Sequence, residues 1–152
     1  YEIMPSLVGS EMCIRDSYDP EYILDFATLT GAVVVALGHI ASGIMGTDPS
    51  LISAIKNSSD TTGEKVWEFP LWDEYLDQVK SKIADVKNLG APGQAGTIAG
   101  GAFLKAFVDD SIPWCHFDIA GSAWGDKKLA YQNPGTASGE VIRLVLDLIE
   151  AK

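Results

Sequence analysis

The sequence predicts a layered α/β domain with a largely parallel sheet. Short apolar or alternating segments, typical of strands, are separated along the chain by segments with helical periodicity. Because parallel strands need long crossovers that are usually helical, this alternation favours a sheet covered by helices. The chain has 152 residues, 47% of them hydrophobic, so it is long enough to bury a substantial core as one domain or part of one.

The stretch ILDFATLTGAVVVALG is the segment around which the rest of the chain is organised. Its pattern predicts a strand over Ile23–Ala27, a polar turn over Thr28–Gly31 and a helix over Ala32–Leu37. Since the helical segment carries no charge that would mark a solvent face, we expect it to be buried on nearly every side.

The polar turn is a candidate ligand site. Thr28 or Thr30 can cap the helix, and Gly31 lets a ligand approach the backbone closely. Ligands commonly bind where a strand runs into a helix in α/β folds, although an ordinary connection is the alternative. A phosphate-binding loop is a poor match, because no lysine follows Gly31 before Lys56.

The rest of the chain continues the alternation. Pro70 prevents the stretch VWEFPL from being a central strand. In chain order we expect a strand over Ala41–Met45, a helix over Leu51–Asn57 capped by Ser50, a polar turn over Asp60–Glu64, a helix over Trp72–Ile83, a loop over Asp85–Gly96, a helix over Thr97–Val108, a strand over Trp114–Ala120, a polar stretch over Ser122–Gly139 and a helix over Glu140–Ala151. We expect nine side chains to be largely buried: Phe26, Leu29, Val34, Leu37, Phe103, Phe107, Ile119, Val141 and Leu148.

The first 17 residues do not fit this pattern. They show no sustained period of 2 or 3.6, and the string SLVGSEMCIRDS resembles translated sequencing-adapter read-through. We interpret residues 1–17 as a non-native leader and residues 18–152 as the domain, with a frayed native terminus as the alternative.

Composition narrows the choice of partner and compartment. The formal charge is −10, from 21 acidic and 11 basic residues, so nucleic acid and anionic membranes would be repelled. No apolar run reaches the roughly 20 residues of a membrane span, and no secretory signal is evident. Two cysteines, Cys13 and Cys115, do not make a disulfide framework, so a cytoplasmic location is the default expectation.

Few residues could carry chemistry by themselves. His116 and Asp118 share one face of an expected strand and could be metal ligands or a His–carboxylate pair. A structural role in a packed layer is the favoured interpretation, because a metal site needs a third ligand. No serine lies in a nucleophile-elbow motif, and Cys115 alternates away from His116.

Five segments, in one order, carry a family resemblance: DFATLTGAVVVALG, GEKVWEFPL, ADVKNLG, AGGAFLKAFV and WCHFDIAG. Together they resemble the leucyl aminopeptidase family of two-metal peptidases, in the C-terminal part of its catalytic domain. The resemblance implies a three-layer α/β/α sandwich with a mostly parallel mixed sheet, present here as a fragment. It also implies a cytoplasmic homo-oligomer, a hexamer when full length, that acts on peptides.

The family's chemistry uses two divalent metal ions, manganese or zinc, and a metal-bridged water that attacks the peptide carbonyl. The resemblance places no catalytic residue and no metal ligand in this chain. It implies a substrate-binding wall, in which the Leu29 carbonyl and the Gly31 amide bind the peptide backbone and Thr28 lines the site. Ala120 and Ala123 would line the pocket for the first side chain. Near the end of the chain, Ser138 stands where the family usually has threonine.

The resemblance therefore predicts part of a metal-dependent aminopeptidase that releases N-terminal residues, with a leucine-type preference. The fragment alone is expected to be inactive, because it carries no ligand for the metals. Two alternatives stay open. One is a non-catalytic assembly subunit of the same fold, and the other is an unrelated α/β domain that binds a ligand at the turn.

Overall fold

A computed structural model describes residues 20–123 and 137–151. The expected leader, residues 1–17, and most of the polar stretch after Ser122 lie outside the described residues. The strands are β1 (Ile23–Ala27), β2 (Ser42–Gly46), β3 (Val66–Glu68) and β4 (Trp114–Asp118). The helices are α2 (Gly31–Leu37), α3 (Pro49–Thr62), α4 (Asp73–Leu76), the 3-10 helix η1 (Asp77–Val79), α5 (Gly96–Lys105) and α6 (Ile142–Glu150).

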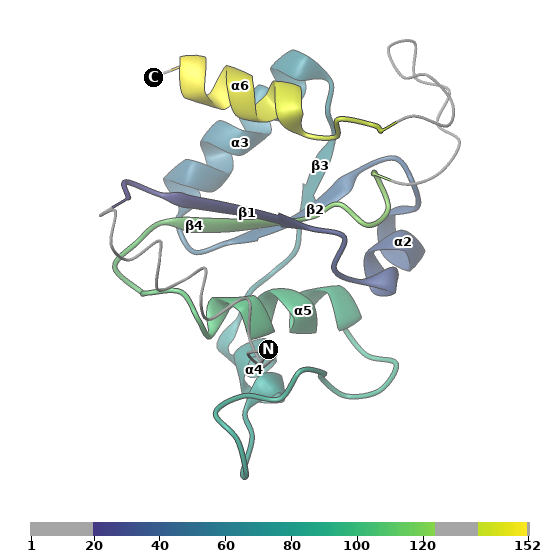
Figure 1. Ribbon diagram of the computed structural model, residues 1–152, viewed down its shortest axis with the longest axis vertical. Helices are drawn as coiled ribbons and strands as arrows, with labels where there is room; N and C mark the ends of the chain where they lie inside the picture. Colours follow the sequence, from purple (N-terminus) through teal and green to yellow (C-terminus); the bar gives the residue numbers. More distant parts are fainter. Residues whose placement is uncertain (1–19, 124–136, 152) are drawn as a thin grey trace, which may run out of the picture.

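The strands form one mixed sheet in the order β1-β4-β2-β3. β1 pairs with β4 and β2 with β3 in parallel, while β2 and β4 are antiparallel. Helices α3 and α6 cover one face and α5 covers the other, with α4 packed against α5 and α2 beside it (Figure 1). This arrangement confirms the three-layer α/β/α sandwich, and β3 lies at the sheet edge as the proline of its segment requires.

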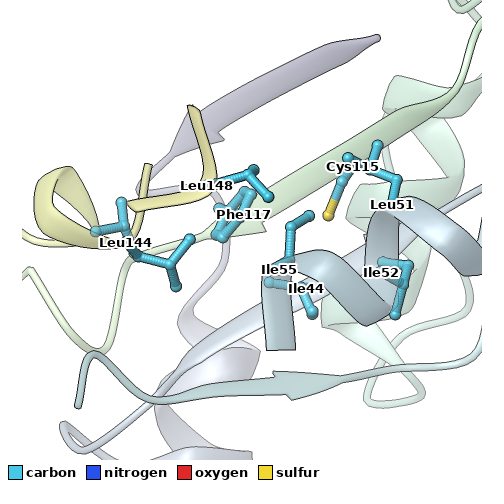
Figure 2. Packing of buried hydrophobic residues seen from close by; sticks show 9 residues of the cluster. Ile44, Leu51, Ile52, Ile55, Cys115, Phe117, Leu144 and Leu148 are labelled. Atoms are coloured by element: carbon cyan, nitrogen blue, oxygen red, sulfur yellow. The ribbon is translucent and has the colours of Figure 1, made fainter. Parts of the chain in front are cut away.

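The main core lies between the sheet and the α3–α6 layer. Phe117 and Cys115 project from β4 toward Ile55 of α3 and Leu144 and Leu148 of α6 (Figure 2). All of these side chains are buried. Because strand side chains alternate, Trp114, His116 and Asp118 point to the opposite face, toward α5. β4 thus supplies only apolar side chains to one face. To the other it supplies two polar groups and Trp114, which packs in a second apolar cluster with Leu104 and Val108.

Helix α2 does not have the environment that its sequence predicts. Val33 is fully buried, but Val35 is 90% exposed and Ala36 is also exposed. The helix contacts β2 and α5, so its apolar residues are covered on one side only. The expectation that Ala32–Leu37 is buried on nearly every side is therefore wrong for the described residues, because a segment without charged residues can still have an exposed face.

Two helix boundaries also differ from the sequence prediction. Asp48, not Ser50, caps α3, and its carboxylate accepts a hydrogen bond from the Leu51 amide at 2.7 Å. Pro49 then occupies the first turn, where its missing N–H costs nothing. The helix continues to Thr62 and ends at Gly63, whose positive φ of 73° suits glycine, so the expected turn over Asp60–Glu64 is mostly helical.

The expected helix over Trp72–Ile83 is wrong in its second half. Regular structure ends with η1 at Val79, Lys80 forms an isolated bridge with Val86, and Ile83 is 98% exposed. Its apolar periodicity therefore overstated the length of the helix. Helix α5 also ends at Lys105, three residues before the expected end at Val108.

The nine expected core residues show a graded outcome. Val141 and Leu148 are buried, and six others are partly buried. Phe26 is 40% exposed, because β1 is an edge strand of the described sheet and only one side of the ring stacks on Phe117, with centroids 4.7 Å apart. Phe26 is therefore not a core residue in this structure.

Candidate functional site

Parallel strands β1 and β4 end side by side, and the turns that follow them meet. Ala27 and Asp118, the last residues of the two strands, are in register. Just beyond them, the Ile119 amide donates a hydrogen bond to the Ala27 carbonyl at 2.9 Å. The Thr28–Gly31 turn and the segment containing Ala120 are therefore neighbours at the carboxyl edge of the sheet, where α/β folds commonly bind ligands.

A single carboxylate holds both turns. Asp118 is fully buried, and its Oδ1 accepts hydrogen bonds from the Leu29 amide at 3.1 Å and the Thr30 amide at 3.4 Å. The same oxygen accepts from the Ala120 amide at 3.2 Å. Its Oδ2 accepts from the Thr30 hydroxyl at 2.6 Å. Hydrogen bonds to a charged acceptor are among the stronger ones in proteins, so this arrangement ties the two turns firmly together.

Thr30 links the carboxylate to helix α2. Its hydroxyl donates to Asp118 and accepts a hydrogen bond from the Val33 amide at 3.2 Å, which makes Thr30 the N-cap. Of the two candidate caps, Thr28 and Thr30, the structure therefore selects Thr30. The Thr97 hydroxyl of α5 lies 3.4 Å from the Thr30 hydroxyl, so the turn is also attached to a third element.

The five residues of the expected substrate-binding wall lie on these two turns. Thr28 and Gly31 are exposed, while Leu29, Ala120 and Ala123 are partly buried. A Cβ atom added at Gly31 would meet no protein atom within 4 Å, so a ligand has room to approach its backbone. Ala123 stays close to the β4 turn because its amide donates to the Ile119 carbonyl at 2.8 Å.

His116 belongs to a second polar network on the same face. Its Nδ1 lies 2.5 Å from Oδ1 of Asp25, and the other oxygen of Asp25 accepts from Trp114 Nε1 at 2.6 Å. His116 and Asp118 are both fully buried, which confirms the expected packed layer. Sequence reasoning missed Asp25, although its register position opposite His116 on the neighbouring strand follows from the parallel pairing.

The surroundings of His116 and Asp118 do not fit a metal centre. Both oxygens of Asp118 are engaged by N–H or O–H donors, and Nδ1 of His116 is paired with Asp25. Within residues 20–123 and 137–151 there is no group of three or more His, Cys, Asp or Glu side chains placed to hold a metal ion. In the same residues, no helix is long and apolar enough to cross a membrane.

An apolar cavity of about 880 Å³ lies beside the turn. Leu29, Thr30 and Ala32 form one side of it, and the loop 88–96 with Phe103 of α5 forms the other. The sequence indicated this loop from its glycines and prolines, but not that it folds toward the turn. Thr28, Gly31, Ala120 and Ala123 are not part of the cavity lining.

Comparison with known proteins gives one consistent family. The model of the cytosol aminopeptidase family, catalytic domain, matches residues 9–146. Probable cytosol aminopeptidases are similar in sequence: one from Geobacter sp. (strain M21) is 48% identical over 89% of the chain and 27% of the relative. One from Geobacter sulfurreducens is 47% identical over 95% of the chain and 29% of the relative. One from Cenarchaeum symbiosum (strain A) is 45% identical over 89% of the chain and 28% of the relative.

A solved structure of a tomato leucine aminopeptidase mutant is similar in fold, with a TM-score of 0.85 and 33% identity. The similarity covers 95% of this chain and 27% of the tomato chain. The chain thus spans less than a third of the length of the relatives that it matches. The family model matches residues 9–146, and the α/β/α fold is shared with a solved leucine aminopeptidase. The chain therefore belongs to the cytosol aminopeptidase family.

Proposed function

We propose that this chain forms the substrate-binding wall of a metal-dependent aminopeptidase that releases N-terminal residues from peptides, with a leucine-type preference. The observation that carries the proposal is the Asp118 carboxylate. Within a chain of this family, it holds the Thr28–Gly31 turn and Ala120 together at the carboxyl edge of the sheet.

In this proposal the turn binds the peptide backbone. The resemblance to the leucyl aminopeptidases assigns the Leu29 carbonyl and the Gly31 amide to the peptide backbone. Asp118 engages the Leu29 and Thr30 amides, so it holds the turn without occupying either of these two groups. The exposed Thr28 lines the same site. Because the turn is held by a buried carboxylate, its backbone groups are fixed before a peptide binds, which lowers the entropic cost of recognition.

Ala120 and Ala123 form the pocket for the first side chain. Both are small and partly buried, so they leave space for a group of leucine or methionine size while contributing apolar contact. Discrimination in such a pocket comes from the methylene groups that it contacts, at about 1–3 kcal/mol for each. A larger side chain at either position would therefore change which peptides are accepted.

In this proposal, the described residues of the chain do not carry out the hydrolysis itself. Two divalent metal ions, manganese or zinc, would activate water and polarise the peptide carbonyl in the full-length protein. Both oxygens of Asp118 and Nδ1 of His116 are engaged by protein groups, so the role that we propose for this chain is to bind and orient the substrate. We further propose that the full-length protein is a cytoplasmic homo-hexamer.

Two substitutions in a full-length protein that carries this segment test the proposal. Gly31→Val should obstruct the approach of the peptide backbone, and Ala120→Phe should fill the side-chain pocket. Both should lower kcat/KM on a leucine anilide, and Ala120→Phe should impair leucine more than alanine substrates. Ser53→Val, an exposed position on α3, is a matched control that adds bulk on the far side of the sheet. Unchanged leucine turnover in both variants would remove these residues from the site.

The chain alone should have neither activity nor tight metal binding. Calorimetric titration of manganese or zinc into the 152-residue chain should show no stoichiometric micromolar binding, and a leucine-anilide assay should show no turnover. Metal binding accompanied by turnover would contradict the structural roles given to His116 and Asp118.

A further inference from the structure

We propose that Asp118 is a positioning residue for substrate selection, because it sets the distance between the backbone-binding turn and the side-chain pocket. The inference rests on the proposed function of the two turns. One oxygen of Asp118 accepts hydrogen bonds from the Leu29 and Ala120 amides, which lie in the turns that follow the neighbouring strands β1 and β4. These two contacts make one atom the junction between the two parts of the wall.

Burial makes this junction rigid. Asp118 is fully buried at the end of β4, and its neighbours within the strand are also buried. An ionised carboxylate that is removed from water needs several donors, and here three amides and one hydroxyl supply them. Moving either turn would leave part of this charge without a donor, so the turns keep a fixed separation.

The second oxygen extends the junction to helix α2. It accepts from the Thr30 hydroxyl, which in turn caps the helix through the Val33 amide. The position of the first turn of α2, including Gly31, is therefore tied to the same carboxylate. Asp118 does not touch the substrate in this scheme, since the groups that it orders make the contacts.

The inference predicts a change in selectivity. If Asp118 sets the width of the site, its loss should affect a leucine substrate, which fills the pocket, more than an alanine substrate, which does not. If it only stabilised the fold, its loss would reduce the folded fraction and lower both activities by the same factor. The ratio of the two kcat/KM values separates these roles.

The variants change defined groups of the junction. Asp118→Asn keeps the size of the side chain but removes its charge. Thr30→Val removes the hydroxyl that reaches the second oxygen and that also caps α2, and Thr30→Ser restores both contacts. Glu64→Gln is the matched control, because Glu64 is also buried and accepts a hydrogen bond from a helix amide, that of Leu144 at 2.8 Å, on the other face of the sheet.

The kinetic experiment uses a full-length aminopeptidase that carries this segment. We expect Asp118→Asn and Thr30→Val to reduce the leucine-to-alanine ratio of kcat/KM by about tenfold, Thr30→Ser to recover most of it, and Glu64→Gln to leave it unchanged. If Asp118→Asn does not fold, the Thr30 pair decides the question alone. An unchanged ratio in folded, active variants would overturn the inference but leave the proposed function intact.

A second measurement uses the 152-residue chain itself. Amide hydrogen exchange should become faster at Leu29, Thr30 and Ala120 together in Asp118→Asn, whereas Glu64→Gln should affect Leu144 instead. Independent changes at the two turns would overturn the inference. Lack of aminopeptidase activity in the unsubstituted full-length protein would overturn the proposed function, and the selectivity role with it.

Discussion

The two faces of β4 differ in how they are stabilised. Toward α3 and α6, Cys115 and Phe117 enter a closed apolar core. Toward α5, His116 and Asp118 enter hydrogen-bonded networks, and an apolar cavity opens nearby. Neighbouring residues of one strand therefore serve two purposes. The apolar face holds the sheet and helices together, and the polar face fixes the turns that form the candidate site.

This division explains where directionality is needed. Apolar packing is non-directional, so it can hold two layers together without fixing the orientation of a turn. Hydrogen bonds to a buried carboxylate fix the positions of the donors to within a few tenths of an ångström. A substrate-binding turn needs the second kind of restraint. The difference can be tested by removing one group at a time from each face.

The largest expected effect is on the apolar face. Phe117→Ala should lower the free energy of unfolding by about 3–5 kcal/mol, because it leaves a cavity among Ile44, Ile55 and Leu148. Phe26→Ala removes the same ring from a position that is 40% exposed and should cost less than half as much. Urea unfolding followed by circular dichroism measures both. Equal losses would show that the β1 edge is as well packed as the centre of the sheet.

On the polar face, Asp25→Ala should have the next largest effect. It removes the acceptor for both His116 Nδ1 and Trp114 Nε1, and a buried group left without a partner costs about 1–3 kcal/mol. We therefore expect a loss of about 2–4 kcal/mol. Asp25→Asn is the matched variant, because its amide oxygen still serves one of the two donors and its cost should be smaller. A cost below about 1 kcal/mol for Asp25→Ala would mean that water replaces the carboxylate.

The sequence predicted the features that follow from local patterns. Strand β1, the β3 edge position and the shared burial of His116 and Asp118 all follow from alternation, proline and strand spacing. The candidate turn was also identified, because a polar TLTG segment between a strand and an apolar helix is locally distinctive.

Features that depend on distant partners were not predicted. The Asp118 contacts join residues 88 and 89 positions apart, and no local pattern records such pairs. The exposure of Val35 depends on which neighbours cover α2, and composition alone does not show this. The cavity requires the loop 88–96 to fold toward Leu29, which its glycines allow but do not specify.

The buried thiol on the apolar face predicts a pH effect. Burial raises the pKa of Cys115 well above its ordinary value of 9.0. Above about pH 9 the unfolded chain therefore loses a proton that the folded chain keeps, and stability falls with rising pH by up to about 1.4 kcal/mol per unit. In a Cys13→Ser background, Cys115→Ala should show a shallower decline between pH 9 and 10. Identical slopes would mean that the thiol ionises in the folded chain.

The smallest expected effect separates stability from function at the turn. Gly31 lies in α2, its φ is not positive, and an added Cβ meets no protein atom within 4 Å. Gly31→Ala should therefore stabilise the chain by about 0.4–1 kcal/mol, because alanine loses less backbone entropy on folding. In a full-length aminopeptidase the same methyl group would stand where the peptide backbone approaches, so kcat/KM on a leucine anilide should fall.

Gly121→Ala is the contrasting variant for this last prediction, because its Cβ would clash with the Gly38 carbonyl oxygen and should destabilise the fold. Thermal unfolding of both variants, with kinetics on the full-length protein, decides the outcome. A stabilised Gly31→Ala variant with unchanged activity would show that the turn does not contact the peptide backbone. A destabilised Gly31→Ala variant would show that protein atoms, rather than open space, surround Gly31.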